Sequence, residues 1–227
     1  MSYPHARPVE NQFIMIGVIH GDREGKALLE ARLESARPDA VTVEVSAYGL
    51  AYRRSKGEEL KQQVRSAADG LKREGRPIDE AALEALYAYI DLPFEFTSAS
   101  DYCARRGVPV FPIDLDRFSS ARLSSMEELV SKENLDRLLS PPVQSGGVCQ
   151  KAVARLFFEK GVKAFSYTEE MLTRDRHMSG VIAGIIKRRA PACLVHICGW
   201  QHLCDPFDEY GPLRPKKVFI HDKAFCV

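Results

Sequence analysis

The sequence has no hydrophobic run long enough to cross a bilayer and almost no net charge. Its longest apolar stretches, such as residues 13–19 and 181–186, fall far short of the roughly 20 residues that a membrane-spanning helix needs. Basic and acidic residues number 32 and 31, so no basic surface for nucleic acid is expected. The first residues lack the apolar segment of a secretory signal. These absences predict a cytoplasmic protein with neither a membrane span nor a nucleic-acid partner.

Two cofactor motifs are absent as well. None of the six cysteines forms a Cys-x-x-Cys pair, which disfavours a zinc ribbon or a thioredoxin-like redox site. The loop after the first predicted strand has no Gly-x-Gly-x-x-Gly fingerprint, which disfavours a dinucleotide enzyme. A chain of 227 residues, 45% of them hydrophobic, can build one domain with a sizeable core. We therefore expect a single domain over residues 1–227.

Two stretches with one shared pattern stand near the two ends of the chain. Residues 13–20 and 193–202 each contain an apolar run with strand character, then a glycine, two further residues and a histidine. These motifs are Gly17-x-x-His20 and Gly199-x-x-His202. Ligands of open α/β sheets bind just outside the carboxyl ends of the strands. We therefore expect the two histidines to reach one pocket.

A strand–helix–strand unit follows from the first of these motifs. Asp22 is a plausible N-cap for a helix that ends before Pro38, and residues 40–46 form the next strand, with Glu44 near its end. Such a unit implies a parallel sheet with a right-handed crossover. Since both strands end at the same edge, His20 and Glu44 are predicted to be neighbours.

The rest of the chain predicts a helical insertion and further sheet elements. Helices over about 47–106 interrupt the alternation directly after Glu44 and either close the pocket as a lid or only pack beside it. Residues 108–116 suggest a third strand that ends in Asp114, and residues 217–221 a last one. Residues 120–140 and 148–160 look helical, with a loop at 141–147 between them. The expected fold is α/β, with a mainly parallel central sheet flanked by helices.

A helix predicted over residues 169–189 carries charges within its apolar arc. Arg174 and Asp175 fall inside that arc, whereas Arg176 points the other way. Charged residues are seldom buried unless they are paired or functional. Either Arg174 and Asp175 form an internal ion pair that anchors the helix, or Arg174 reaches the pocket and binds negative charge there. His196, in the middle of its strand, is expected to be a core histidine with its hydrogen bonds satisfied.

The order of these motifs resembles that of the TraB/PrgY family. That family is grouped with the Tiki proteases, the ChaN-like haem-binding proteins and the erythromycin esterases. The matching segments are Gly17-x-x-His20, residues 38–44, residues 114–116, residues 174–178 and Gly199-x-x-His202, with Thr173 where the family has a glutamate. The resemblance implies a core like that of ChaN and the erythromycin esterases, and a site built from His20, Glu44 and His202.

The leading hypothesis for function is a hydrolase that acts on a peptide or a small-molecule ester. His20, Glu44 and His202 would hold a divalent metal such as zinc, manganese or iron, or a histidine oriented by Glu44 would activate water directly. Asp114 could orient a histidine from behind, and Arg174 could polarise the substrate carbonyl. The alternative is a non-catalytic regulatory protein that binds haem, through the two histidines, or a peptide. The oligomeric state stays open.

Overall fold

A parallel five-stranded sheet lies at the centre of the computed structural model, which describes residues 12–140, 150–161 and 165–222. The strand order is β3-β2-β4-β1-β5, and all four neighbouring pairs are parallel. The strands are β1 (Gln12–Val18), β2 (Ala40–Val43), β3 (Val110–Pro112), β4 (Cys193–Gly199) and β5 (Lys216–Phe219). The predicted α/β class with a mainly parallel sheet is confirmed.

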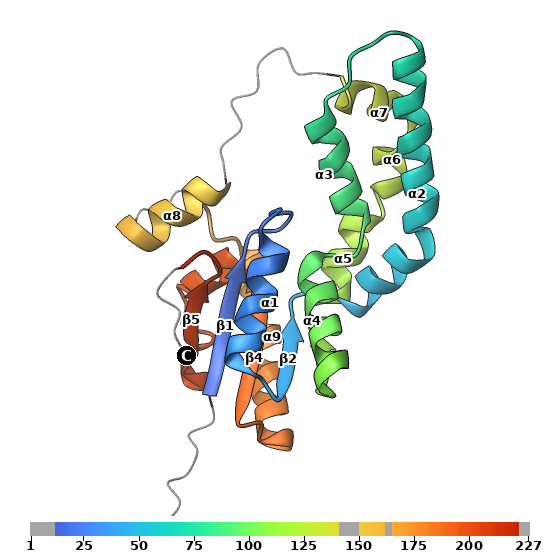
Figure 1. Cartoon of the computed structure of the whole chain (residues 1–227). Helices are drawn as coiled ribbons and strands as arrows, with labels where there is room; N and C mark the ends of the chain where they lie inside the picture. Colours follow the sequence, from blue (N-terminus) through green and yellow to red (C-terminus); the bar gives the residue numbers. More distant parts are fainter. Residues whose placement is uncertain (1–11, 141–149, 162–164, 223–227) are drawn as a thin grey trace, which may run out of the picture.

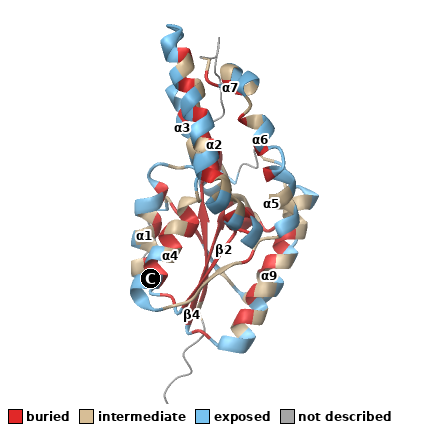
Figure 2. Cartoon of the chain, turned by 90° about the vertical axis from the view of Figure 1, so that its right-hand side faces the viewer, coloured by how far each residue is buried: buried red, intermediate tan, exposed pale blue. Residues whose placement is uncertain are grey.

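Helices cover both faces of this sheet (Figure 1). On one face lie α1 (Gly25–Ala36) and α4 (Phe94–Arg106), and on the other lies α9 (Glu169–Arg189). The bounds of α9 are those that the sequence predicts. Every residue of β2 and β4 is buried, and the strands stand out as a buried layer in Figure 2. Strands covered on both faces are apolar throughout, which is why the two motifs read as continuous hydrophobic runs.

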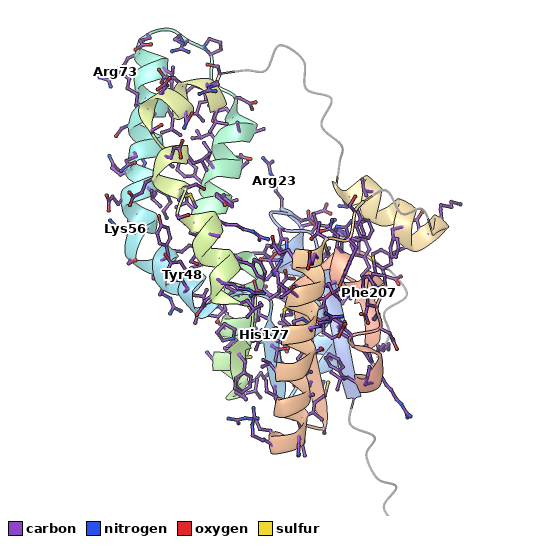
Figure 3. All side chains as sticks on the ribbon, turned by 180° about the vertical axis from the view of Figure 1, so that it is seen from behind. Arg23, Tyr48, Lys56, Arg73, His177 and Phe207 are labelled. Carbon is purple, nitrogen blue, oxygen red and sulfur yellow. The ribbon has the colours of Figure 1, made fainter. Side chains whose placement is uncertain are left out.

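A helical arm extends beyond the carboxyl edge of the sheet (Figure 1). It consists of α2 (Ala47–Arg73), α3 (Glu80–Ile90), α5 (Asp116–Leu123), α6 (Met126–Leu129) and α7 (Lys132–Leu138). The arm has an apolar cluster of its own, which includes Leu60, Leu86 and Leu135, while Lys56 and Arg73 point outward from α2 (Figure 3). The arm therefore differs in extent from the insertion predicted at 47–106. Within that range α4 packs on α1 and does not belong to the arm, whereas residues 116–138 join it.

The strand order brings the two Gly-x-x-His motifs onto adjacent strands. β4 lies between β1 and β2, with Val18 opposite Gly199 and Val43 opposite Ile197. His20, Glu44 and His202 therefore follow three neighbouring strands at one edge of the sheet. His20 and Glu44 are predicted to be neighbours, but β4 separates the strands that they follow. Gly199, at the end of β4, therefore lies between them.

Two local predictions concern the N-cap of the first helix and a helix at 148–160. Asp22 does not cap α1, which begins at Gly25 after Glu24; its carboxylate accepts a hydrogen bond from the Glu24 amide and pairs with His221 at 2.6 Å instead. The helix α8 (Gln150–Lys160) is present, but the predicted loop at 141–147 lies outside the described residues. Among the described residues, no helix is both long and apolar enough to span a membrane.

Candidate functional site

A cavity of about 800 Å³ opens at the carboxyl edge of the sheet, beneath the helical arm. All five residues that the sequence singles out line it: His20, Glu44, Asp114, Arg174 and His202. The arm contributes the opposite wall through α2 and α3, which carry Arg53 and Tyr89. The arm therefore shapes the cavity.

Glu44 is the centre of a buried network of charges. One of its carboxylate oxygens, Oε2, accepts a hydrogen bond from the Gly199 amide at 2.6 Å. The other, Oε1, accepts one from Arg174 and lies 3.1 Å from His202 Nε2. Burial by itself raises the pKa of Glu44, but the charges of His202 and Arg174 outweigh burial and hold that pKa well below 4.5. Glu44 is therefore an anion whose two oxygens are both occupied.

Arg174 pairs across the sheet edge and not with its neighbour Asp175. Its Nε and Nη2 donate to the two oxygens of Asp114 at 2.9 and 2.8 Å, and Nη2 also donates to Glu44. This two-point pairing fixes the plane of the guanidinium. Asp114 thus orients an arginine, where the sequence predicted that it would orient a histidine. Arg174 Nη1 is less engaged: it makes no hydrogen bond with a side chain of the described residues, and it lies 4.0 Å from Oε1 of Glu170.

His202 is held as a cation by two carboxylates. Its Nδ1 lies 2.5 Å from Asp175 Oδ1, and its Nε2 faces Glu44. Asp175 also accepts hydrogen bonds from the hydroxyls of Tyr210, at 2.9 Å, and Tyr167. Burial lowers the pKa of His202, but Glu44 and Asp175 outweigh it and raise that pKa to about 10. At neutral pH both ring nitrogens therefore carry a proton and donate it.

The raised pKa of His202 makes the stability of the protein depend on pH. The folded-state pKa of about 10 exceeds the ordinary 6.5, so the stabilisation is complete below pH 6.5 and is lost as the pH rises towards 10. We expect the melting temperature to fall over this range, and His202→Gln to flatten the curve. His177→Gln, at a half-buried position of α9, is the control; an identical slope in both variants would contradict the assignment.

His20 differs from His202 in that its side chain is exposed and has only one carboxylate partner. Nδ1 lies 2.7 Å from Oε1 of Glu95, a buried residue of α4. The His20 side chain is 62% exposed, and Nε2 has no hydrogen-bond partner among the described residues. The surrounding protein lowers the pKa of His20, but the hydrogen bond and charge of Glu95 outweigh this and raise it above 6.5. His20 is thus an oriented, accessible titrating group.

The sequence reasoning missed Glu95, which orients His20 in place of the expected Glu44. A signal was present, because Glu95 shares one face of α4 with Ala99 and Tyr102, and all three are buried. An acidic residue on an apolar helix face is buried only with a partner. What the sequence could not supply is the packing of α4 against α1, which brings that face to His20.

His196 lies in the core as predicted, but its hydrogen bonds are only half satisfied. Nδ1 lies 3.0 Å from the Thr42 hydroxyl, and Nε2 is buried without a partner among the described residues. Burial lowers the pKa of His196 to about 4, so the ring is neutral. His196 is therefore a core residue and not part of the cavity wall.

Gly199 leaves room for the His20 ring. A Cβ at this position would lie 2.9 Å from His20 Nε2, closer than ordinary van der Waals contact. We expect Gly199→Ala to displace the imidazole and reduce function, with a modest loss of stability, because the φ of −57° suits alanine. Gly180→Ala is the matched control, since nothing lies within 4 Å of its Cβ position. A crystal structure of Gly199→Ala with His20 unmoved would contradict this.

The three expected metal ligands do not present free donor atoms to a common point. Metal-bound histidine must be deprotonated, yet both nitrogens of His202 donate to carboxylates, and both oxygens of Glu44 accept hydrogen bonds. The metal-bound form of the site therefore stays a prediction, and the steps proposed below use only the side chains of the chain itself.

Comparisons with known proteins leave this site to be interpreted from its own geometry. No protein-family model, curated protein or solved structure matches the chain. The class that fold and cavity define is an α/β protein with a charged pocket at the carboxyl edge of a parallel sheet.

Proposed function

We propose that the protein is a hydrolase of ester or peptide bonds in which His20 is the general base. The observation that carries this proposal is the His20–Glu95 pair: one ring nitrogen lies 2.7 Å from a buried carboxylate oxygen, and the exposed side chain lines a cavity of about 800 Å³. A histidine held in this way is a common design for general-base catalysis, because the carboxylate selects the tautomer with a free Nε2. The resemblance to the TraB/PrgY family is consistent with it.

In the proposed reaction, neutral His20 takes a proton from a water molecule that attacks the substrate carbonyl. Glu95 keeps the Nδ1 proton in place and stabilises the imidazolium that forms. The negative charge that develops on the carbonyl oxygen is stabilised by Arg174, whose Nη1 is the least engaged of its nitrogens. When the tetrahedral intermediate collapses, the C–O or C–N bond to the leaving group breaks, and the His20 imidazolium gives its proton to the departing alcohol or amine. Glu44, Asp114 and the His202 cation fix that guanidinium, so they act as positioning residues.

The experiment is a hydrolysis screen with p-nitrophenyl esters and a fluorogenic peptide library, using wild type and His20→Gln. The proposal predicts turnover that depends on His20 and survives dialysis against a chelator. No turnover of any member, or equal turnover by the variant, would contradict it. Turnover that disappears on dialysis and returns with zinc, manganese or iron would favour the metal-dependent form of the hydrolase.

A second candidate is the haem- or peptide-binding regulatory protein. It is favoured by the same exposed side chain, because His20 Nε2, which makes no hydrogen bond with the described residues, would be available to hold haem iron. His202 would first have to release a carboxylate. A Soret band on adding haem, lost in His20→Gln, together with no turnover in the screen, would favour this candidate. A cytoplasmic location is part of either proposal.

A further inference from the structure

One arginine in the cavity wall has no carboxylate partner. Arg174 and Arg122, which also line the cavity, pair with acidic residues, but no acidic oxygen of the described residues lies within 4.0 Å of Arg53. Its Nε is buried with no hydrogen bond, and its Nη1 makes only a 3.4 Å contact with the Gly49 carbonyl. A buried donor without an acceptor costs free energy of folding. Arg53 is therefore a cation that lacks its anion.

A second unused donor lies beside Arg53, near Gly49, which is one turn earlier on α2. A Cβ at Gly49 would lie 3.0 Å from Ser46 Oγ, 3.3 Å from Arg53 Nη1 and 3.5 Å from Ser119 Oγ, so the guanidinium and the Ser119 hydroxyl approach the same glycine. Ser119 makes no side-chain hydrogen bond with the described part of the chain. Both Arg53 and Ser119 line the cavity, so two donors stand side by side in its wall where an oxyanion can bind.

Arg53 lines the same cavity as the proposed base. Glu95, the partner of His20, is near enough for its charge to act on Arg53, and His20, Glu95 and Tyr89 on α3 all line this cavity. An anionic group held by Arg53 would therefore position the rest of the molecule in front of His20. The exposed ring of Tyr89 offers an apolar surface beside it.

We propose that Arg53 and Ser119 bind a carboxylate of the substrate, so that the enzyme acts on acidic acyl compounds such as peptides with a free carboxylate. This inference rests on the proposed function, whose substrate class it names. A single guanidinium with the Glu95 anion nearby suits a monoanion better than a doubly charged phosphate. The planar fork of arginine also matches the two oxygens of a carboxylate.

The test is equilibrium binding of N-benzoylglycine and of its amide, N-benzoylglycinamide, by titration calorimetry. Wild type is expected to bind the acid roughly tenfold to a hundredfold more tightly than the amide, the range for a hydrogen-bonded charge. Arg53→Met should remove this preference, Arg53→Lys should keep part of it, and Ser119→Ala should reduce it. Arg54→Met, the next residue on α2 and outside the cavity wall, should keep it in full.

Three results would overturn the inference. They are equal affinity for acid and amide in wild type, a preference that survives Arg53→Met, and competition by inorganic phosphate that exceeds competition by acetate. The same titrations in His20→Gln separate this inference from the proposed function. Binding that persists there while hydrolysis is absent from every variant would reject the hydrolase and retain the carboxylate site. Melting curves of each variant show that it is folded.

Discussion

Replacing His20 with glutamine is expected to lower kcat/KM of hydrolysis by about 10²- to 10⁴-fold, the usual contribution of a general base. Glutamine keeps a polar side chain in the cavity but cannot accept and carry a proton. The loss should fall on kcat, because His20 acts on the attacking water and not on the substrate. Stability should change little, since the ring is 62% exposed and makes one hydrogen bond.

Glu95→Gln separates orientation from proton transfer. Glutamine retains a hydrogen-bonding side chain on α4 but removes the charge that stabilises the imidazolium, so the rate should fall while the protein remains folded. Ser98→Ala is the control, since it is buried on the same helix and its hydroxyl has no partner among the described residues. Full activity in Glu95→Gln would show that the His20–Glu95 pair is only structural.

Arg174→Met is expected to destabilise the protein by about 3–5 kcal/mol, because it leaves the Asp114 carboxylate without its cation and Glu44 with His202 as its remaining cation. Burial by itself lowers the pKa of Arg174, yet Glu44 and Asp114 outweigh it and raise that pKa, so the charged form is strongly favoured. For a domain of this size the loss corresponds to roughly 6–20 °C in melting temperature. Differential scanning calorimetry measures it directly.

Arg176→Met provides the matched control on the same helix. Arg176 is exposed and makes one surface ion pair with Glu209, which contributes at most about 1 kcal/mol. If the two variants melt at the same temperature, the network around Glu44 does not hold the edge of the sheet together. Adding Glu44→Gln to Arg174→Met should cost less than the sum of the two single changes, because it removes one of the two anions that have lost the arginine.

The sequence could predict which residues line the cavity because strand ends are a property of order and periodicity. His20, Glu44 and His202 each follow an apolar run, and parallel strands end at one edge. The place of Arg174 in the site could be predicted because a charged residue on an apolar helix face is seldom buried unless it is paired or functional. Those inferences need only local pattern.

The pairing of these side chains could not be predicted, since it depends on tertiary packing. Which carboxylate meets which histidine is set by α4 docking on α1, which delivers Glu95, and by the rotation of α9, which delivers Asp175 to His202. The extent of the helical arm was missed for a similar reason: α5 to α7 bury their apolar faces against α2 and α3, which precede them by dozens of residues. The periodicity of apolar residues in one helix does not show which distant helix it packs against.

The pH dependence of kcat/KM in wild type and Glu95→Gln tests the central claim most directly. A general base must be neutral, so the rate should rise as the pH increases through the pKa of His20, which lies above 6.5. Glu95 is the main group that raises this pKa, so the profile of the variant should move to lower pH while its maximum rate falls. A profile with the same midpoint in both proteins would contradict the account.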